Sequence, residues 1–388
     1  MATLSRELRK HSLMFLLLLG VLMFCAGCGS SGSSSGPSGQ SQTVVNQTIY
    51  VSQGAEVDSF PISSSLAQTG NVAPATALTG TNTTFSDTHR TAFDSTGRMY
   101  ETDIDNYTVD IFPSGATGNL APTAYITVNC ASGIAIDSSD NVYVSDPCDG
   151  IIYVYPAVAS TATGAVSTSP TYSIQGSNTT LDFPNGIALN TKGTQLWVAN
   201  EDAGDVLCFT LPTAVVSGAQ NLAPTATITG IPDTTTTPAS VTPFGKVHSV
   251  ALDSSNLVYV TGTSTSNTGD TKSNASSGNN YTSAIYIYSS SAVQGVSGAA
   301  TPVATITGSN TGLENLNGIS LDYNNNIYVG NNADYIDGGN PGAEVLVFLA
   351  GSQGNVAPVA TIGQGSDDTN KTGITAIHGV TIGPTPKS

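Results

Sequence analysis

The chain has 388 residues, of which 39% are hydrophobic and 10% are charged, with 41 glycines and 19 prolines. This composition suits one large all-β domain rich in turns, and no stretch shows the apolar period of a long amphipathic helix. A formal net charge of -17 repels phosphate backbones and excludes nucleic acid as a partner.

Residues 1–28 have the pattern of a secretory signal peptide. Arg6, Arg9 and Lys10 form a charged end, and an unbroken apolar run follows from Leu13 to Phe24. The run is too short to span a bilayer comfortably, so we expect it to be cleaved.

The apolar run ends in CAGC, which resembles the bacterial lipobox. In that motif small residues precede a cysteine that is diacylated, here Cys28, although Cys25 stands where leucine is commonest. CAGC also has the spacing of a CxxC redox pair, but the neighbouring βαβ pattern of a thioredoxin-like site is missing. Residues 29–47 are rich in Gly and Ser and form a flexible tether. We therefore expect an exported protein held by its lipid in the bacterial cell envelope, facing the periplasm or the cell surface.

A unit of four short strands repeats along the remaining chain. Its clearest copy, Leu181–Thr210, contains the strands GIALN, QLWVAN and DVLCFT, and APTATITG at 223–230 supplies the fourth. The same text recurs as SGIAIDSSDNVYVSD, HSVALDSSNLVYVTG and NGISLDYNNNIYVGN. Repeated four-stranded units predict a radial or stacked array.

The repeats can be aligned on the residue that ends each first strand, and the first spacing is 43 residues. The aligned residues are Asp94, Asp137, Asn190, Asp253, Asp322 and Gly383. Strands at 48–53 and 56–62 lack a first strand before them, and IHGVTIG at 377–383 can supply it. We therefore predict that residues 48–388 form an all-β, six-bladed β-propeller of four-stranded antiparallel blades, with the ring closed by one C-terminal strand and three N-terminal strands.

The motifs FPNGIALN, SGIAIDSSDNVYVSD and HGVTIG resemble the NHL-repeat family. One aromatic residue recurs in each second strand and is expected to pack in the core between blades. These residues are Tyr50, Tyr100, Tyr143, Trp197, Tyr259 and Tyr328.

Two polar registers are expected to meet on one face of the ring, where the loops vary in length. These loops are 231–246, 262–283, 331–342 and 365–376. The inner register precedes the end of each first strand by five positions and contains His89, Ser132, Asn185, His248, Asn317 and His378. The outer register follows each second-strand aromatic by three positions and contains Gln53, Asp103, Asp146, Asn200, Gly262 and Asn331.

These polar residues allow two interpretations. They can satisfy one another, the loop amides and channel water. Alternatively they form a ligand-binding mouth, in which His89, His248 and His378 are the candidate ligands of a divalent cation such as zinc or calcium.

Two enzyme types built on six-bladed propellers are relevant by resemblance. Gluconolactonase-like proteins hold a cation with Glu, Asn and Asp, and this chain offers Asn185 and Asn317 but no carboxylate in the inner register. Peptidylglycine amidating lyase, an NHL-repeat relative, holds zinc with three His. Here His378 and His89 lie on adjacent blades and His248 lies opposite His89, so a symmetric three-His site does not follow.

The cysteines support an oxidising compartment. Cys130 and Cys148 flank one predicted hairpin at matched positions, so a disulfide is feasible, with an unpaired pair of thiols as the alternative. Cys208 lies in an alternating strand and is expected to be a small buried side chain. Aspartates in the turns between first and second strands are expected to form Asx turns.

We expect a monomeric binding or protein-interaction module that uses the polar mouth and the long loops of one face. Its partner would be a glycan, a peptide or another envelope protein, with the membrane reached through the lipid. The alternative is a metal-dependent lyase or lactone hydrolase on the propeller axis, and a purely structural envelope module is the third option.

Overall fold

The structure is a computed structural model, and it describes residues 47–62, 70–166, 169–214, 216–233, 240–265, 281–333, 342–363 and 371–385. All of them belong to one compact unit, residues 45–388. Across these ranges the chain forms strands and turns, as predicted, and contains no helix long and apolar enough to cross a membrane. The predicted signal peptide, Cys28 and the tether up to residue 46 lie outside the described residues.

The repeating element is a run of four antiparallel strands. In the first complete run, β4 (Thr88–Phe93), β5 (Met99–Asp103), β6 (Thr108–Phe112) and β7 (Ala124–Thr127) pair in chain order. Four further runs have the same order: β8 (Ile134–Ile136), β9 (Val142–Asp146), β10 (Ile151–Tyr155) and β12 (Tyr172–Ile174); β13 (Pro184–Leu189), β14 (Gln195–Asn200), β15 (Asp205–Thr210) and β17 (Ala226–Asp233); β18 (Ser240–Leu252), β19 (Leu257–Thr265), β20 (Tyr281–Ser289) and β22 (Ala304–Ile306); β23 (Leu316–Leu321), β24 (Ile327–Ala333), β25 (Gly342–Phe348) and β26 (Ala360–Gly363).

The two ends of the described chain close the ring. β27 (Gly379–Pro384) pairs with β1 (Gln47–Gln53), which continues into β2 (Glu56–Pro61) and β3 (Thr76–Thr79). Six residue pairs from Gln47↔Pro384 to Ser52↔Gly379 define this antiparallel register. The prediction that one C-terminal strand completes a sheet with three N-terminal strands is therefore confirmed.

Six separate sheets were predicted, but the hydrogen bonds divide the strands into five sheets. The difference lies at β17 and β18, where residues 230–233 pair with residues 240–243 and join two runs into a nine-stranded sheet. The predicted loop 231–246 thus contributes strand at both of its ends. This extension depends on pairing between two runs, so the sequence of either run alone does not predict it.

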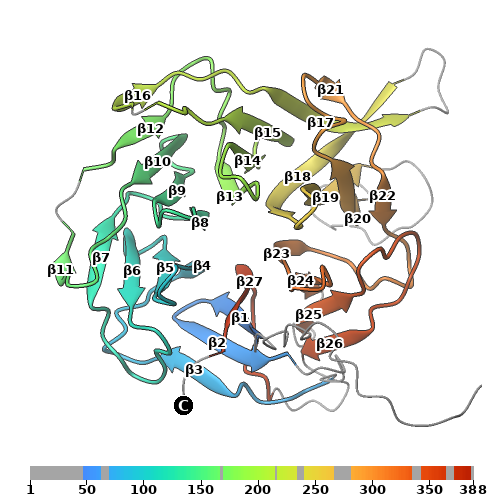
Figure 1. Cartoon of the computed structure of the whole chain (residues 1–388). Coiled ribbons are helices and arrows are strands. Elements are labelled where there is room, and N and C mark those ends of the chain that lie inside the picture. The colour runs from blue at the N-terminus through green and yellow to red at the C-terminus, as the bar shows by residue number, and fades with distance from the viewer. Residues whose placement is uncertain are drawn as a thin grey trace, which may run out of the picture. The chain divides into compact units, whose positions relative to one another are not determined.

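The strands are arranged as a propeller, with the first strand of each run nearest the centre (Figure 1). The inner strands β27, β4, β8, β13, β18 and β23 contact one another in that order, and β23 contacts β27 again. Glycines allow this close approach: a Cβ on Gly133 would lie 2.2 Å from the carbonyl oxygen of Asn185, and a Cβ on Gly379 would lie 2.2 Å from that of His89. The polar residues that precede these glycines are therefore held close together around the centre.

The outer edge of each run is covered by the run that follows it. β7 pairs in parallel with β11 (Gly164–Ala165), β12 with β16 (Gly218–Gln220) and β17 with β21 (Ser297–Ala299). Single parallel bridges do the same elsewhere: Leu78↔Gly118, Ile306↔Gly354 and Gly70↔Ile362. No outer strand of the described ring is left without a partner of this kind, which removes the exposed edges that favour aggregation.

Asparagine side chains form hydrogen bonds at the same junctions. Asn82 lies in the segment that leads from β3 to β4, and its backbone N–H donates to the side-chain oxygen of Asn119, between β6 and β7, at 2.7 Å. Equivalent bonds join Asn221 to Asn178, Asn355 to Asn310, and Asn71 to Lys371 and Thr372. The repeated text GN(L/V)AP or QNLAP therefore marks a junction between runs as well as the start of an outer strand.

The turns between first and second strands are Asx turns, as expected. Asp94 accepts the backbone N–H of Thr96 at 2.9 Å and that of Arg98 at 3.0 Å. Asp137, Asp253 and Asp322 accept equivalent pairs of backbone N–H groups. These acidic residues are thus used by the fold.

The recurrent aromatics are core residues, as predicted. All six are at most 6% exposed, and Trp197 and Tyr100 are fully buried. The hydroxyls of Tyr100, Tyr259 and Tyr328 donate to the Asx-turn aspartate of their own run, at 3.2–3.4 Å. In the run that carries Trp197, which has no hydroxyl, the turn residue is Asn190 in place of an aspartate.

Candidate functional site

The inner register forms a connected polar cluster. The rings of His89 and His378 lie with centroids 4.7 Å apart. Nδ1 of His89 lies 3.3 Å from the hydroxyl of Ser132, which donates to Oδ1 of Asn185 at 3.0 Å. Four neighbouring inner strands therefore bring their predicted residues into contact.

Glu201 extends this cluster. It follows β14 directly, and its Oε2 accepts from Nδ2 of Asn185 at 2.8 Å and lies 3.3 Å from Nδ1 of His248. Its Oε1 accepts from Nζ of Lys246 at 2.8 Å. Burial alone would raise the pKa of Glu201, but these hydrogen bonds, led by the one from His248, lower it to about 2. The carboxylate is thus ionised and acts only as an acceptor.

Asp87 lies on the other side of the cluster. Its Oδ1 is 3.1 Å from Nδ1 of His378, and its Oδ2 is 3.5 Å from Nε2 of His89. Burial opposes ionisation here too, but the hydrogen bonds from His378 and His89 hold the pKa of Asp87 well below its usual range. Burial lowers the pKa of His89, and the Asp87 carboxylate only partly offsets that effect.

Arg90 reaches across the centre of the ring. Its guanidinium donates to the carbonyl of His89 at 3.0 Å, to Oδ1 of Asn317 at 3.1 Å and to the carbonyl of His248 at 3.5 Å. The inner strands that carry these acceptors are β4, β23 and β18. Arg90 is 7% exposed, and its hydrogen bonds link three inner strands. Through it Asn317 joins the cluster, which completes the inner register.

A buried glutamate accompanies this arginine. Glu101 in β5 is fully buried and accepts a hydrogen bond from the hydroxyl of Thr91 at 2.5 Å. Burial raises the pKa of Glu101 to about 8, with hydrogen bonds and Arg90 opposing the rise. Burial also lowers the pKa of Arg90 to about 10, against the influence of Glu101 and Glu201. The two side chains thus interact electrostatically within the protein.

The outer register has different contacts. Asp103 accepts the backbone N–H groups of Ser86 and Asp87 at 2.7 and 3.0 Å, so it fixes the segment that enters β4. Asn200 and Asn331 accept equivalent N–H groups from Asp182 and Glu314, both at 2.7 Å. The remaining members are Gln53, which accepts from Thr375, Asp146, which accepts from Asp149, and Gly262, which has no side chain. Asp103, Asp146, Asn200 and Asn331 are fully buried, so their contacts give them a structural role in shaping the loops.

The candidate metal ligands do not converge as a set of three imidazoles. His89 and His378 share a group of potential donors with Asp87, whose ligand atoms all lie within 4.8 Å of one another among the described residues. His248 is not part of this group and pairs with Glu201 instead. The structure thus brings two of the three candidate imidazoles together with a carboxylate that the sequence analysis did not name.

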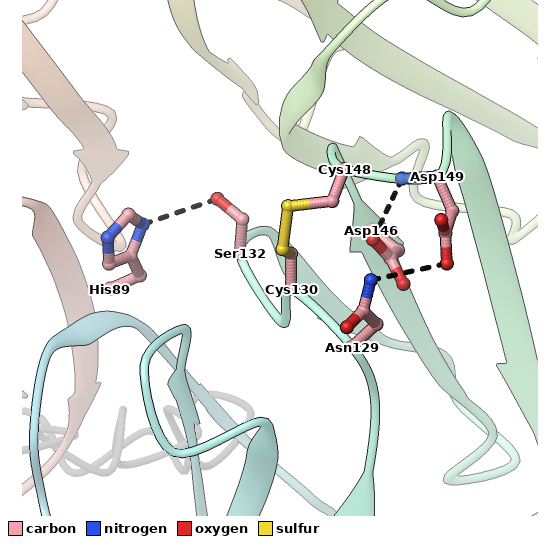
Figure 2. The surroundings of a disulfide bond; sticks show 7 residues. All are labelled: His89, Asn129, Cys130, Ser132, Asp146, Cys148 and Asp149. Atoms are coloured by element: carbon pink, nitrogen blue, oxygen red, sulfur yellow. Dashed lines mark hydrogen bonds between the residues drawn. A yellow bond between two sulfur atoms is a disulfide. The ribbon is translucent and has the colours of Figure 1, made fainter.

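A disulfide joins Cys130 and Cys148, whose Cα atoms lie 5.8 Å apart. The positions of the two cysteines in the sequence made this bond feasible. Figure 2 shows the hydroxyl of Ser132, two residues along the chain from Cys130, directed at the ring of His89. The bond therefore fixes the segment that places Ser132. Cys208 is fully buried, and burial raises the pKa of its thiol, which agrees with its expected role as a core residue.

Sequence reasoning missed four residues of the site. Asp87 and Glu201 lie outside both registers, but Glu201 directly follows Asn200 of the outer register. Arg90 and Glu101 could have been found by comparing repeats. The position of Arg90 holds Gly133, Gly186, Ser249, Gly318 and Gly379 in the other repeats, and the position of Glu101 holds Val51, Val144, Val198, Val260 and Val329.

The site combines fixed charges with groups that can exchange protons. The side chains of His89 and His248 are each 18% exposed, that of His378 is 26% exposed and that of Asp87 is 29% exposed. A polar molecule at this face can therefore reach imidazoles, carboxylates and the ammonium group of Lys246. The same groups can bind a cation or transfer protons.

Comparisons with known proteins give the fold alone. No family model matches the chain, and no curated protein matches it. A solved protein of unknown function from Bacteroides caccae is similar over 87% of this chain and 99% of its own, with 10% identity and a TM-score of 0.52. A chain from a nidogen/laminin complex is similar over 88% of this chain and 100% of its own, with 13% identity and a TM-score of 0.51. At these identities the shared property is the architecture of the β domain, and the function has to be argued from the site.

Proposed function

We propose that the protein is a binding module that holds a polar ligand on the face formed by the inner register. One observation carries this proposal: residues at all six inner strands join in a single cluster of hydrogen bonds, ion pairs and one contact between imidazole rings, and this cluster is still partly exposed. A cluster with only a structural role can be fully buried, as the outer register is. Partial exposure of imidazoles and carboxylates is typical of a site that meets a ligand.

The chemistry of the cluster favours a ligand with many hydroxyl, amide or charged groups. Asn185 and Asn317 offer amides, Glu201 and Asp87 offer acceptors, and Lys246, whose side chain is 57% exposed, offers a donor. A glycan, a peptide or a segment of an envelope protein fits this description. The acidic surface argues against nucleic acid, and we propose that the module acts as a monomer.

Soluble muropeptides test the proposal, because they carry both amino sugars and peptide. We expect isothermal titration calorimetry to detect binding to the full chain and Asn185→Leu to abolish it. The matched control is Lys192→Ala, in the exposed turn at the other end of the same hairpin, which should leave binding intact. Equal binding by both variants would place the ligand elsewhere. Absence of binding by muropeptides and by envelope proteins alike would overturn the proposal.

We also propose that the ring has six blades of the NHL-repeat type. Six inner strands in contact and six registered copies of the repeat support this count. On this interpretation the nine-stranded sheet consists of two blades linked by the extended ends of β17 and β18. An experimental electron-density map checks it: a break between residues 230–233 and 240–243 is compatible with six blades, whereas a different number of inner strands is not.

We propose that Cys28 carries a lipid that anchors the module in the bacterial envelope. The disulfide supports an oxidising compartment, and the sequence before residue 47 supports export. Cys28→Ser should release the protein from membranes or leave it unprocessed, which fractionation and mass spectrometry measure. A mature Cys28→Ser protein that stays in the membrane would contradict this anchor.

The second function expected from the sequence, a metal-dependent lyase or lactone hydrolase, has less support from the geometry. It was expected to use His89, His248 or His378 as ligand or base, and His248 is paired with Glu201, which also binds Lys246. Binding of a ligand therefore remains the function that the site supports best.

A further inference from the structure

Three side chains with metal-binding atoms converge at one side of the inner register. Asp87 and His89 come from the start of β4, and His378 directly precedes β27, so closure of the ring brings them together. Asp87 places one oxygen 3.1 Å from Nδ1 of His378 and the other 3.5 Å from Nε2 of His89. Nδ1 of His378 also lies 3.2 Å from the carbonyl oxygen of Thr88, so a cation bound by this nitrogen would replace its proton. Asp103 holds the backbone N–H of Asp87 at 3.0 Å and so fixes the segment that carries this carboxylate.

The hydrogen bonds that lead away from His89 fix its tautomer. The Glu201 carboxylate can only accept, so the amide of Asn185 must turn its NH₂ group toward Glu201 and its oxygen toward Ser132. Ser132 has one hydroxyl proton and gives it to that oxygen. Its hydroxyl oxygen can therefore only accept from His89, which must carry a proton on Nδ1.

Because Nδ1 bonds to Ser132, Nε2 is the nitrogen of His89 that faces Asp87, at 3.5 Å from Oδ2. A proton on Nε2 makes this contact the hydrogen bond described above, and a metal cation that takes the place of that proton can bind both atoms. The second nitrogen of a metal-bound histidine is usually held by a hydrogen bond like that of Nδ1 to Ser132.

The separations of the donor atoms fit a transition metal. Zinc binds imidazole nitrogens and carboxylate oxygens at about 2.0–2.2 Å in tetrahedral geometry, which sets the distance between ligand atoms at roughly 3.4 Å. The separations of the Asp87 oxygens from His378 and His89, 3.1 and 3.5 Å, bracket this value, and all three ligand atoms lie within 4.8 Å of one another. Two nitrogens and one carboxylate suit zinc better than calcium, which prefers oxygen ligands only.

We propose that Asp87, His89 and His378 bind one zinc ion, or a divalent cation of similar chemistry, with Ser132, Asn185 and Glu201 as the hydrogen-bonded chain that orients His89. Three protein ligands leave a coordination position for water or for a ligand atom, and the 18–29% exposure of these side chains allows access to it. This inference is independent of the proposed ligand, because it concerns the binding of the ion alone.

The test uses the full chain with a tag that contains no histidine, stripped with chelator and titrated with ZnCl₂ in a calorimeter. We expect one zinc per chain, and Co²⁺ in its place should give the visible absorption bands of a tetrahedral site. Asp87→Asn, His89→Gln and His378→Gln should each weaken zinc binding by about 100-fold or more, and Ser132→Ala by roughly 10–100-fold. Thermal melts in chelator show whether each variant is folded. One folded variant among the three ligand substitutions is enough to test the site.

His248→Gln discriminates between this site and a site of three imidazoles. We expect it to leave the zinc affinity unchanged, because His248 contacts Glu201 and lies outside the cluster of three donors. A similar loss in His248→Gln would overturn the proposed ligand set. Zinc binding that is absent in the wild-type chain, or that persists in all three ligand variants, would overturn the site itself. Either failure leaves the test of muropeptide binding at Asn185 unaffected.

Discussion

The hairpins β4–β5 and β13–β14 have the same frame but differ at two positions near the centre. Both begin with an inner-register residue, turn at an Asx residue and bury an aromatic in the second strand. After the inner-register residue, β13 has Gly186, whose added Cβ would lie 2.8 Å from the Cα of Ser249, whereas β4 has Arg90. After the aromatic, β14 has Val198 and β5 has Glu101. The shared residues build the repeat, and the two differences introduce charge at the axis.

The largest expected effect comes from giving β14 the acid of β5. Val198 is fully buried among apolar side chains, so Val198→Glu places a carboxyl group where no arginine compensates it. We expect a loss of at least about 4 kcal/mol in the free energy of unfolding, measured by urea denaturation. Val198→Met introduces an uncharged side chain of a size close to that of glutamate and should lower the free energy of unfolding much less. Equal losses would show that size, not charge, separates the two hairpins.

The next effect comes from removing the arginine. Arg90→Met leaves three oxygens on three strands without their donor and removes the buried positive charge that interacts with Glu101 and Glu201. We expect a loss of about 3 kcal/mol in the free energy of unfolding. Arg90→Lys keeps the charge but not the planar fork of donors and should fall between Met and wild type. An Arg90→Met protein as stable as wild type would mean that the axial contacts contribute nothing to stability.

The pH dependence sharpens the comparison further. Burial raises the pKa of Glu101 to about 8, and that of Asp58 and Asp110 to about 7. The native state therefore binds more protons than the unfolded state above about pH 4.5, and stability falls as pH rises toward 8, by up to about 1.4 kcal/mol per unit for each group. Between pH 7 and 8 the decline should come mainly from Glu101.

Urea denaturation at pH 7 and pH 8 measures this decline, and Glu101→Gln should flatten it. The opposite behaviour is expected in acid: Glu201, with its pKa lowered to about 2, contributes stability above about pH 4.5 that is lost as pH falls toward 2. A Glu101→Gln protein with an undiminished decline between pH 7 and 8 would assign the titration to another group.

The smallest effect concerns a feature that the runs share. Asn119→Ala, Asn221→Ala and Asn355→Ala each remove one side-chain acceptor from a junction between neighbouring runs. Each should cost about 1 kcal/mol in thermal or urea unfolding, because the lost bond is exposed. Losses that differ severalfold among the three would show that these junctions are not equivalent.

Much of the fold could be predicted because its signals are local. Alternating burial, turn residues and the repeated aromatics define each run, and the missing first strand at the N-terminal end predicts that IHGVTIG closes the ring. The joining of two runs through β17 and β18 was not predictable, since it depends on the path of one insertion against another.

The site was predictable only where it follows the repeat. His89, Asn185 and His378 were placed correctly on one face because side chains alternate along a strand. Asp87 and Glu201 reach the same place from loop positions, and their approach depends on three-dimensional paths. The outer register was expected to line the mouth, but its side chains bond to loop backbone instead, a choice that the residue types alone do not reveal.

The position of β1 determines how the domain would respond to force. β1 begins at Gln47 and lies between β27 and β2, with six paired residues on each side. A pull applied to the chain before Gln47 must therefore shear two ladders at once, where a terminal strand at the edge of a sheet would resist with only one. A module tethered from that end would carry its load in the sheet where β1 pairs with β27. Stretching would therefore strain the segment next to His378 before the strain reached the opposite side of the ring.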